Sequence, residues 1–95
     1  MHVRFSDAAR ADIRNIRNYL TPIDPVAAKR VVDFILTTAY QLETFPLLGR
    51  HGRVAGTREV KIPRYPYFIV YVLADAYHVD IEAVFHTRQQ YPSSD

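Results

Sequence analysis

Three short runs of β-branched and aromatic residues, near the end of the chain, most constrain its fold. They are residues 57–62, 67–73 and 78–86, with the sequences TREVKI, YFIVYVL and HVDIEAVFH. Each run is bounded by Pro, Gly or a short polar break, which is typical of neighbouring antiparallel strands. The sequence therefore predicts a three-stranded antiparallel meander.

The pattern inside these strands predicts which faces are covered. In the last strand apolar and polar side chains alternate, with Val79, Ile81, Ala83 and Phe85 against His78, Asp80, Glu82 and His86. One face of that strand is therefore expected to be buried and the other exposed to water. The middle strand is apolar on both faces, which a strand covered on one side does not require. Its second face, formed by Phe68, Val70 and Val72, is expected to need a further cover.

Two helices are predicted ahead of the meander. Ser6 is a suitable N-cap for a helix over residues 7–20. Asp24 and Pro25 are a cap and a first helical residue for a second helix that extends to about Thr44. Both segments place apolar residues on one stripe at intervals of three and four. The stripes are Ala9, Ile13, Ile16 and Leu20 in the first helix and Ala28, Val32, Ile35, Ala39 and Leu42 in the second.

These elements predict one fold. Residues 1–5 alternate and are expected to join the sheet as a short strand, and the helical hairpin is expected to pack on the core face of the sheet. The prediction is a small two-layer α+β domain of order β-α-α-β-β-β. With 95 residues of which 48% are hydrophobic, the chain can bury one core but not two. Residues 1–95 are therefore expected to form one domain, with a frayed tail from Gln89 onward.

The composition indicates the cellular compartment of the protein. The sequence has no cysteine, and its longest apolar run is far shorter than a membrane span. Its first residues lead directly into a charged helix, without the apolar region of a secretion signal. We expect a soluble cytoplasmic protein with no membrane partner.

Basic residues are unevenly distributed. The net charge of +2 is too small to predict a nucleic-acid partner. However, residues 50–64 hold five basic residues against one acid, Glu59: they are Arg50, Arg53, Arg58, Lys61 and Arg64. A second row, Arg10, Arg14 and Arg17, follows one face of the first helix. A solvated helix surface is the simpler interpretation of that row.

The chemistry-bearing residues exclude several kinds of site. The four histidines, His2, His51, His78 and His86, do not have the spacing of a metal site. No serine lies in a nucleophile elbow, and the three glycines do not form a phosphate-binding loop. We therefore expect no metal and no cofactor.

One set of residues near the open face of the meander has two interpretations. Its members are Lys61, Arg64, His86, Arg88 and Tyr91. Cations that bind phosphate, a histidine or Glu82 that moves a proton, and a tyrosine that stacks on a base would equip a metal-free ribonuclease. Alternatively, Glu59, Lys61 and Glu82 form cross-strand ion pairs, with His86 a partly exposed strand end. Spacing alone favours the second interpretation.

Five segments in register resemble a known family. They are DAARADI (7–13), FPLLGR (45–50), GTRE (56–59), YPYFIVY (65–71) and VFHTR (84–88). Together they are similar to the RelE/ParE superfamily of type II toxins, across nearly the whole chain. The resemblance implies the same β-α-α-β-β-β fold. It also implies a small bacterial toxin that is silenced by an antitoxin encoded beside it, whose C-terminal part wraps the toxin.

That superfamily has two branches, and the residues bear on the choice between them. One branch cleaves mRNA on the ribosome, and the ParE-like branch poisons DNA gyrase. The nuclease branch commonly has two lysines on the second strand and an arginine early in the third. Here Lys61 fits, but Glu59 occupies the other lysine position and Phe68 the arginine position.

The end of the chain also departs from the nuclease pattern, which has an arginine and a tyrosine beyond the fourth strand. Thr87 stands near the arginine position, and Arg88 and Tyr91 would substitute only if the register shifts. An anionic transition state needs preorganised positive charge, so the loss of an arginine to Phe68 weakens the nuclease interpretation. The resemblance therefore favours a ParE-like toxin that binds DNA gyrase and is not an enzyme. The alternatives are a RelE-like ribosome-dependent mRNA endoribonuclease and an inert relative that only pairs with its antitoxin.

The ParE-like interpretation assigns roles to two groups of residues. Target or phosphate contacts are expected from Arg50, Arg53, Arg58, Arg64 and Arg88. The second face of the middle strand, with Phe68, Val70 and Val72, is expected to be an exposed groove that the antitoxin buries. Self-association through the same patch would instead give a homodimer.

Overall fold

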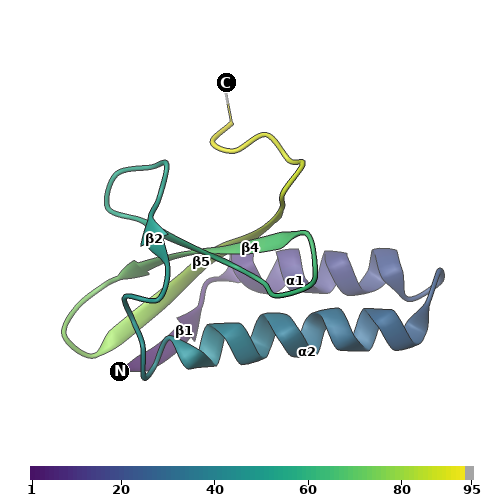
Figure 1. Cartoon of the computed structure of the whole chain (residues 1–95), viewed down its shortest axis with the longest axis horizontal. Helices are drawn as coiled ribbons and strands as arrows, with labels where there is room; N and C mark the ends of the chain where they lie inside the picture. The colour runs from purple at the N-terminus through teal and green to yellow at the C-terminus, as the bar shows by residue number, and fades with distance from the viewer. Residues whose placement is uncertain (94–95) are drawn as a thin grey trace.

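The computed structural model, which describes residues 1–93, has two helices packed on one face of a five-stranded sheet (Figure 1). The elements are β1 (His2–Phe5), α1 (Asp7–Leu20), α2 (Pro25–Gln41), β2 (Arg50–His51), β3 (Arg58–Lys61), β4 (Tyr67–Leu73) and β5 (His78–His86). The predicted two-layer α+β fold is confirmed. The two-residue strand β2 is an addition, because the sequence analysis predicted no strand between the second helix and the meander.

The sheet has the strand order β1-β5-β4-β3-β2. The meander β3-β4-β5 is antiparallel, and β1 pairs with β5 in parallel, from His2 opposite His78 to Phe5 opposite Ile81. The first and last strands of the chain are therefore neighbours, and β2 and β1 are the two edges.

Local capping explains where the helices begin. The Ser6 hydroxyl accepts a hydrogen bond from the Ala9 N–H at 3.0 Å, and the Asp24 carboxylate accepts one from the Ala27 N–H at 3.0 Å. Both predicted caps are confirmed. The predicted end of the second helix near Thr44 is wrong, because α2 ends at Gln41. Beyond it the Thr44 N–H bonds back only three residues, to the Gln41 carbonyl at 3.2 Å, so the last turn is tighter than an α-helix.

The core lies between the helices and the inner face of the sheet. Its most deeply buried large side chains are Ile35 and Leu42, from the second helix and its cap, with Ile69, Tyr71, Val79 and Ile81 from the sheet. Ile13, Ile16 and Leu20 of α1 pack against this cluster while partly exposed. The apolar stripes of both helices therefore cover the sheet, except that Val31 of α2 joins the core cluster and the predicted Val32 does not.

A β-bulge changes which face the end of β5 presents. Tyr71 pairs with Ile81 while Val70 pairs with Ala83, so Glu82 has no partner on β4. One extra residue reverses the alternation from that point on. The prediction that Val79, Ile81, Ala83 and Phe85 share one face is therefore wrong: Val84 joins the core, whereas Ala83 and Phe85 lie on the opposite face.

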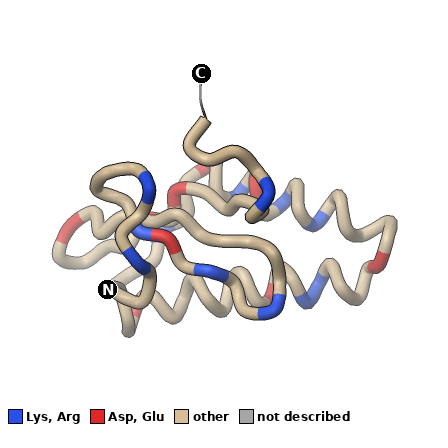
Figure 2. Tube along the Cα trace, turned by 45° about the horizontal axis from the view of Figure 1, so that its top comes forward, with Lys and Arg blue, Asp and Glu red and all other residues tan. Residues whose placement is uncertain are grey.

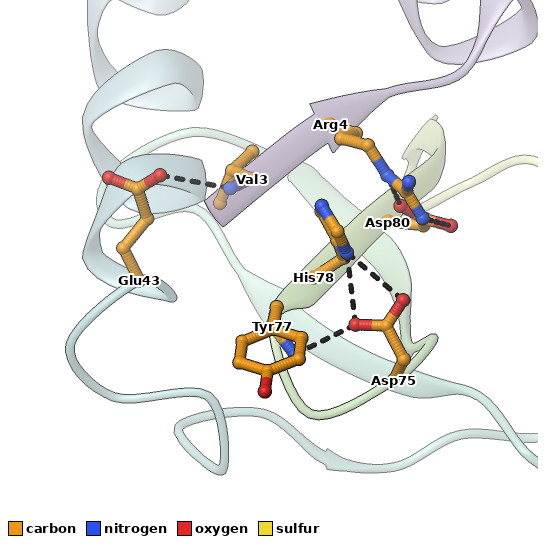
Figure 3. A network of polar contacts seen from close by, with 7 residues as sticks. All are labelled: Val3, Arg4, Glu43, Asp75, Tyr77, His78 and Asp80. Carbon is orange, nitrogen blue, oxygen red and sulfur yellow. Dashed lines mark hydrogen bonds and ion pairs between the residues drawn. The ribbon is translucent and has the colours of Figure 1, made fainter. Parts of the chain in front are cut away.

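A polar network fastens the β1 edge of the sheet and the β4–β5 turn (Figure 3). The Arg4 guanidinium contacts both Asp80 carboxylate oxygens at 2.7 and 3.0 Å. Asp75 accepts the Tyr77 N–H at 2.7 Å and lies 2.9 Å from Nδ1 of His78. These two contacts hold the pKa of Asp75 below its ordinary value of 3.8, and the Tyr77 N–H has the larger effect, ahead of His78.

The Asp75 contacts predict an acid-dependent contribution to stability. A carboxyl group with a lowered pKa stabilises the fold above its ordinary pKa, and that contribution is lost as the pH falls through the folded value. Asp75→Asn is therefore expected to lower the Tm slightly at neutral pH and to have less effect in strong acid. Thermal unfolding followed across the acid range checks this. An equal decrease at both ends of the range would contradict it.

Candidate functional site

The face of the sheet opposite the helices, here called the outer face, carries some of the residues singled out on the meander, including Glu59, Lys61 and Phe68. Two cross-strand rows form it. In one row Lys61 lies opposite Phe68, which lies opposite Phe85; in the other, Glu59 lies opposite Val70, which lies opposite Ala83. Figure 1 shows the loop after β2 and the C-terminal segment on this side of the sheet. The outer face is thus one apolar patch with a charged border.

The chain covers this apolar patch with its own C-terminal segment. Tyr91 packs on Phe85 with ring centroids 4.6 Å apart, and on Phe68 at 5.9 Å. Phe68 and Val70 are each only 3% exposed, and Val72 is half-buried. The prediction of an exposed groove at these three residues is therefore wrong. The expected fraying is also absent up to Ser93, whereas Ser94 and Asp95 lie outside the described residues.

Arg53 connects this cover to the sheet. Its guanidinium lies 4.9 Å from the Phe68 ring centroid and 5.6 Å from that of Tyr91, and it donates to the Tyr91 carbonyl at 3.1 Å. It also pairs with the Glu59 carboxylate at 3.3 Å. Glu59 accepts the Arg53 backbone N–H at 2.9 Å as well, and its side chain is only 4% exposed. Arg53, whose side chain is 43% exposed, therefore acts as a clamp between the sheet and the C-terminal segment, and Glu59 holds the clamp in place.

A cavity of about 340 Å³ opens beside the clamp. Its lining comes from the β2 region, β3, β4 and the end of β5: Leu48, Gly49, Arg50, Arg53, Glu59, Val60, Lys61, Phe68 and Thr87. Three cations and one carboxylate meet there. Arg50 is 67% exposed on its side chain and only 4.0 Å from Glu59, whereas Arg53 is engaged by Glu59. The cavity can accept an anionic group from a partner, although the buried carboxylate offsets one of its three positive charges.

Arg58 lies on the other side of the sheet. On β3 it lies opposite Tyr71 of β4, and its guanidinium donates to the Gly49 carbonyl at 2.9 Å. The Tyr71 hydroxyl donates to the Pro46 carbonyl at 2.8 Å and accepts the Gly49 N–H at 2.9 Å. Burial raises the pKa of Tyr71, against smaller opposing effects of the Gly49 N–H and Arg58. Arg58 and Tyr71 therefore fix the segment that leads into β2.

The remaining candidates do not converge on the cavity. Arg64 is exposed in the β3–β4 turn, with a positive φ of 71°. His86 lines a different, largely apolar groove of about 620 Å³ between the helices and that turn. The Arg88 N–H donates to Nδ1 of His86 at 3.0 Å, and the Arg88 side chain is exposed. Of the five predicted nuclease residues, Lys61 alone lines the cavity within residues 1–93, and Tyr91 lies near it through Phe68 and Arg53.

Two parts of these sites were not predicted from the sequence. Thr87 was considered only as a residue in an arginine position, yet it lines the outer cavity. The groove beside His86 is walled by Val31 and Tyr65 and by Ile16, Leu20 and Tyr67, and the last three were assigned only to a helix stripe or a strand. Tyr19 at the border of this groove is exposed and lies off the apolar stripe of α1. An aromatic residue outside the stripe is a signal in the sequence that could have indicated this groove.

Residues 1–93 contain no group of three or more His, Asp or Glu that could hold a metal ion. Neither helix in that range has the length and hydropathy needed to cross a membrane.

Comparison with known proteins identifies the family. The family model described as ParE toxin of the type II toxin-antitoxin system parDE matches residues 3–91. A protein of Sinorhizobium fredii (strain NBRC 101917 / NGR234), Y4kP, which is named as a candidate toxin, is 37% identical over 90 residues, or 95% of this chain and 92% of its own length.

Solved structures agree with this match. A chain of the chromosomal ParDE TA system from P. aeruginosa has a TM-score of 0.80 at 20% identity, covering 90% of this chain and 95% of its own. A chain of the toxin-antitoxin complex RelBE2 from Mycobacterium tuberculosis has a TM-score of 0.60 at 29% identity, covering 88% and 94%. Since the family model spans nearly all of the sequence, this chain belongs to the ParE toxin family of type II toxin-antitoxin systems.

Proposed function

We propose that this toxin acts by binding DNA gyrase and that it does not cut RNA. The observation that carries the proposal is the ion pair between Arg53 and the buried Glu59 at 3.3 Å on the outer face. A nuclease of the related branch needs unopposed cations at this place. Here a carboxylate engages one of the three cations, Arg53, and the aromatic residue Phe68 occupies a position where the nuclease pattern has an arginine.

Electrostatics supports this choice. An anionic phosphoryl transition state is stabilised by donors that are fixed in advance and directed at the developing charge. Arg53 is fixed in advance, but it is directed at Glu59 and at two aromatic rings. Lys61 lines the cavity without a carboxylate partner among residues 1–93. Lys61 and the exposed Arg50, beside a buried carboxylate, are a weak equivalent of the nuclease set.

The exposed cations remain as candidate target contacts. Arg50, Arg64 and Arg88 are exposed and carry no ion pair closer than 4.0 Å within residues 1–93. Arg53 and Arg58 have internal partners, Glu59 and the Gly49 carbonyl respectively. We therefore assign target binding to Arg50, Arg64 and Arg88 and structural roles to the other two.

An antitoxin partner is part of the proposal. The two similar solved structures are described as a ParDE TA system and as a toxin-antitoxin complex. Antitoxin binding at Phe68, Val70 and Val72 stays a prediction. Because Tyr91 covers Phe68 in the isolated chain, that mode of binding requires the C-terminal segment to move first.

Two assays with purified protein test the target. Wild type and Lys61→Ala are both expected to inhibit gyrase supercoiling and to leave mRNA intact in a translating extract. Arg50→Glu combined with Arg64→Glu is expected to lose inhibition, because charge reversal repels an acidic or phosphate-bearing partner. The matched control is Arg30→Glu, which reverses one exposed charge on α2.

The ribonuclease is the second candidate, favoured by the presence of Lys61 at the cavity and Tyr91 close by. It would be established by cuts in mRNA phased with codons on the ribosome and lost in Lys61→Ala and Tyr91→Phe. Absence of both activities and of growth arrest on induction would identify an inert relative that only pairs with its antitoxin.

A further inference from the structure

The segment between α2 and the edge strand β2 carries the densest group of exposed apolar side chains in the part of the chain that the structure describes. Phe45, Leu47 and Leu48 are each more than half exposed. Elsewhere in residues 1–93, exposed large apolar residues lie at least three positions apart in the sequence. Single exposed apolar side chains are ordinary on a protein surface, whereas a contiguous group indicates an interaction site.

The protein holds the backbone of this segment rigidly from the inside. The buried Tyr71 hydroxyl bonds both the Pro46 carbonyl and the Gly49 N–H. The Arg58 guanidinium bonds the Gly49 carbonyl, and the Leu48 N–H donates to the carbonyl three residues earlier at 3.0 Å. The proline ring also fixes its own φ. The segment therefore has little conformational freedom left to lose when a partner binds, which favours affinity.

An exposed cation and a cavity adjoin the apolar side chains. Leu48 and Arg50 both line the cavity of about 340 Å³ on the outer face. The one carboxylate within 4.0 Å of Arg50 among residues 1–93 is Glu59, and Arg53 lies closer to it, at 3.3 Å. Figure 2 shows basic positions along β2, β3 and the loops beside them, with one acidic position among them. This surface therefore combines apolar contact area with a cation that has room for a partner's anionic group.

This combination selects the kind of partner. Phosphates of a nucleic acid would satisfy Arg50, but they would gain nothing from Phe45 and Leu47. A second copy seated two-fold on the same surface would place Arg50 against its counterpart, and like charges disfavour such an interface. A protein surface with an apolar recess bordered by an acid satisfies both parts. Because Arg50 is assigned above to target binding, continuity with it favours the target over the antitoxin.

We propose that residues 45–50 are the anchor by which this toxin holds its protein target. Phe45, Leu47 and Leu48 enter an apolar recess of the target, and an acidic side chain of the target enters the cavity and pairs with Arg50. The inference rests on the proposed function and adds to it the apolar part of the contact.

The first test measures binding of purified DNA gyrase to the full-length chain. Leu47→Asp is expected to weaken binding at least about tenfold, because a charge then has to be buried against an apolar surface. Leu47→Ala, which only shortens the side chain, is expected to weaken binding about threefold, and this loss should persist as salt is added. The loss in Arg50→Gln is instead expected to shrink with salt, because it is electrostatic.

Ile23→Asp is the matched control. Ile23 is 68% exposed, against 65% for Leu47. It lies just before α2 and residues 45–50 lie just after it, so a helix of 17 residues, about 25 Å long, separates the two places. Ile23→Asp is expected to change gyrase binding less than about twofold. Circular dichroism on each variant verifies that the fold is intact.

Two results with these variants would overturn the proposal. One is an equal loss of gyrase binding in Leu47→Asp and Ile23→Asp. The other is gyrase binding that stays at the wild-type level in both Leu47→Asp and Leu47→Ala, which would sink this inference and leave the proposed function intact. A wild-type chain that does not bind gyrase at all would overturn the proposed function and this inference with it.

A second test separates the target from the antitoxin. The same variants are titrated with the antitoxin encoded beside the chain, and Leu47→Asp is expected to keep that affinity within about twofold of wild type. Loss of antitoxin binding in Leu47→Asp, with gyrase binding kept, would assign residues 45–50 to the antitoxin and overturn the proposal.

Discussion

Arg53→Ala is expected to lower the free energy of unfolding by about 2–3 kcal/mol, because it leaves a buried carboxylate without its cation. The Glu59 side chain is 4% exposed and pairs with Arg53 at 3.3 Å. The backbone N–H of residue 53 still donates to it, which limits the loss. The substitution also removes a guanidinium that packs 4.9 Å from the Phe68 ring and bonds the Tyr91 carbonyl. Urea denaturation measures the change.

A double-mutant cycle separates the two contributions of Arg53. In Arg53→Ala/Glu59→Gln the unpaired charge is gone, so the double variant is expected to recover about 1 kcal/mol relative to Arg53→Ala alone. The matched control is Arg50→Ala, whose exposed side chain lies 4.0 Å from the same carboxylate. Its cost is expected to stay below about 1 kcal/mol. If Arg50→Ala and Arg53→Ala cost the same, Arg53 is not the clamp described here.

Gly49→Ala is expected to destabilise the protein by a similar amount, about 2–3 kcal/mol, because no space exists for a side chain. A Cβ at residue 49 would lie 2.7 Å from the Glu59 carbonyl oxygen and 2.8 Å from the Tyr71 ring. The Glu59 carbonyl belongs to the backbone of β3. Tyr71 is fully buried, and its hydroxyl is hydrogen-bonded to both Pro46 and Gly49. The clash therefore has to be relieved by moving the sheet or the segment that precedes β2.

Gly56→Ala is the control for this prediction. A Cβ there meets nothing within 4 Å, but the φ of Gly56 is +82°, a conformation that costs an L-residue about 1 kcal/mol. Thermal unfolding of the two variants should therefore show a clearly larger loss for residue 49. Similar losses would mean that the segment before β2 moves easily, which would contradict its proposed anchoring by Tyr71 and Arg58.

Local signals in the sequence were sufficient for most of the fold. The helix starts at residues 7 and 25 follow from hydrogen bonds between residues three apart, at Ser6 and Asp24, so they were predictable from a few neighbouring residues. The ranges of β4 and β5 follow from runs of β-formers bounded by turns. The family resemblance, carried by five segments, was confirmed by the match to residues 3–91.

The site was harder to predict because it depends on distant contacts. The bulge opposite Val70 and Tyr71 moves Phe85 to the outer face, and no alternation pattern contains that extra residue. The cover over Phe68 depends on the hydrogen bond between Arg53 and Tyr91, two residues that are 38 positions apart in the sequence. A pattern of apolar positions can show that a face needs covering. It cannot show which segment of the chain does so.

The parallel pairing of β1 with β5 has a consequence for the timing of folding. His2–Phe5 can enter the sheet only beside residues 78–81, and the Ser6 hydroxyl that caps α1 also donates to the Glu82 carbonyl at 2.9 Å. Contacts this distant along the chain form late, because a long loop must close first. During synthesis, β1 therefore cannot pair until residues 78–81 have left the ribosome. This edge of the sheet in a nascent chain therefore stays incomplete until β5 has been made.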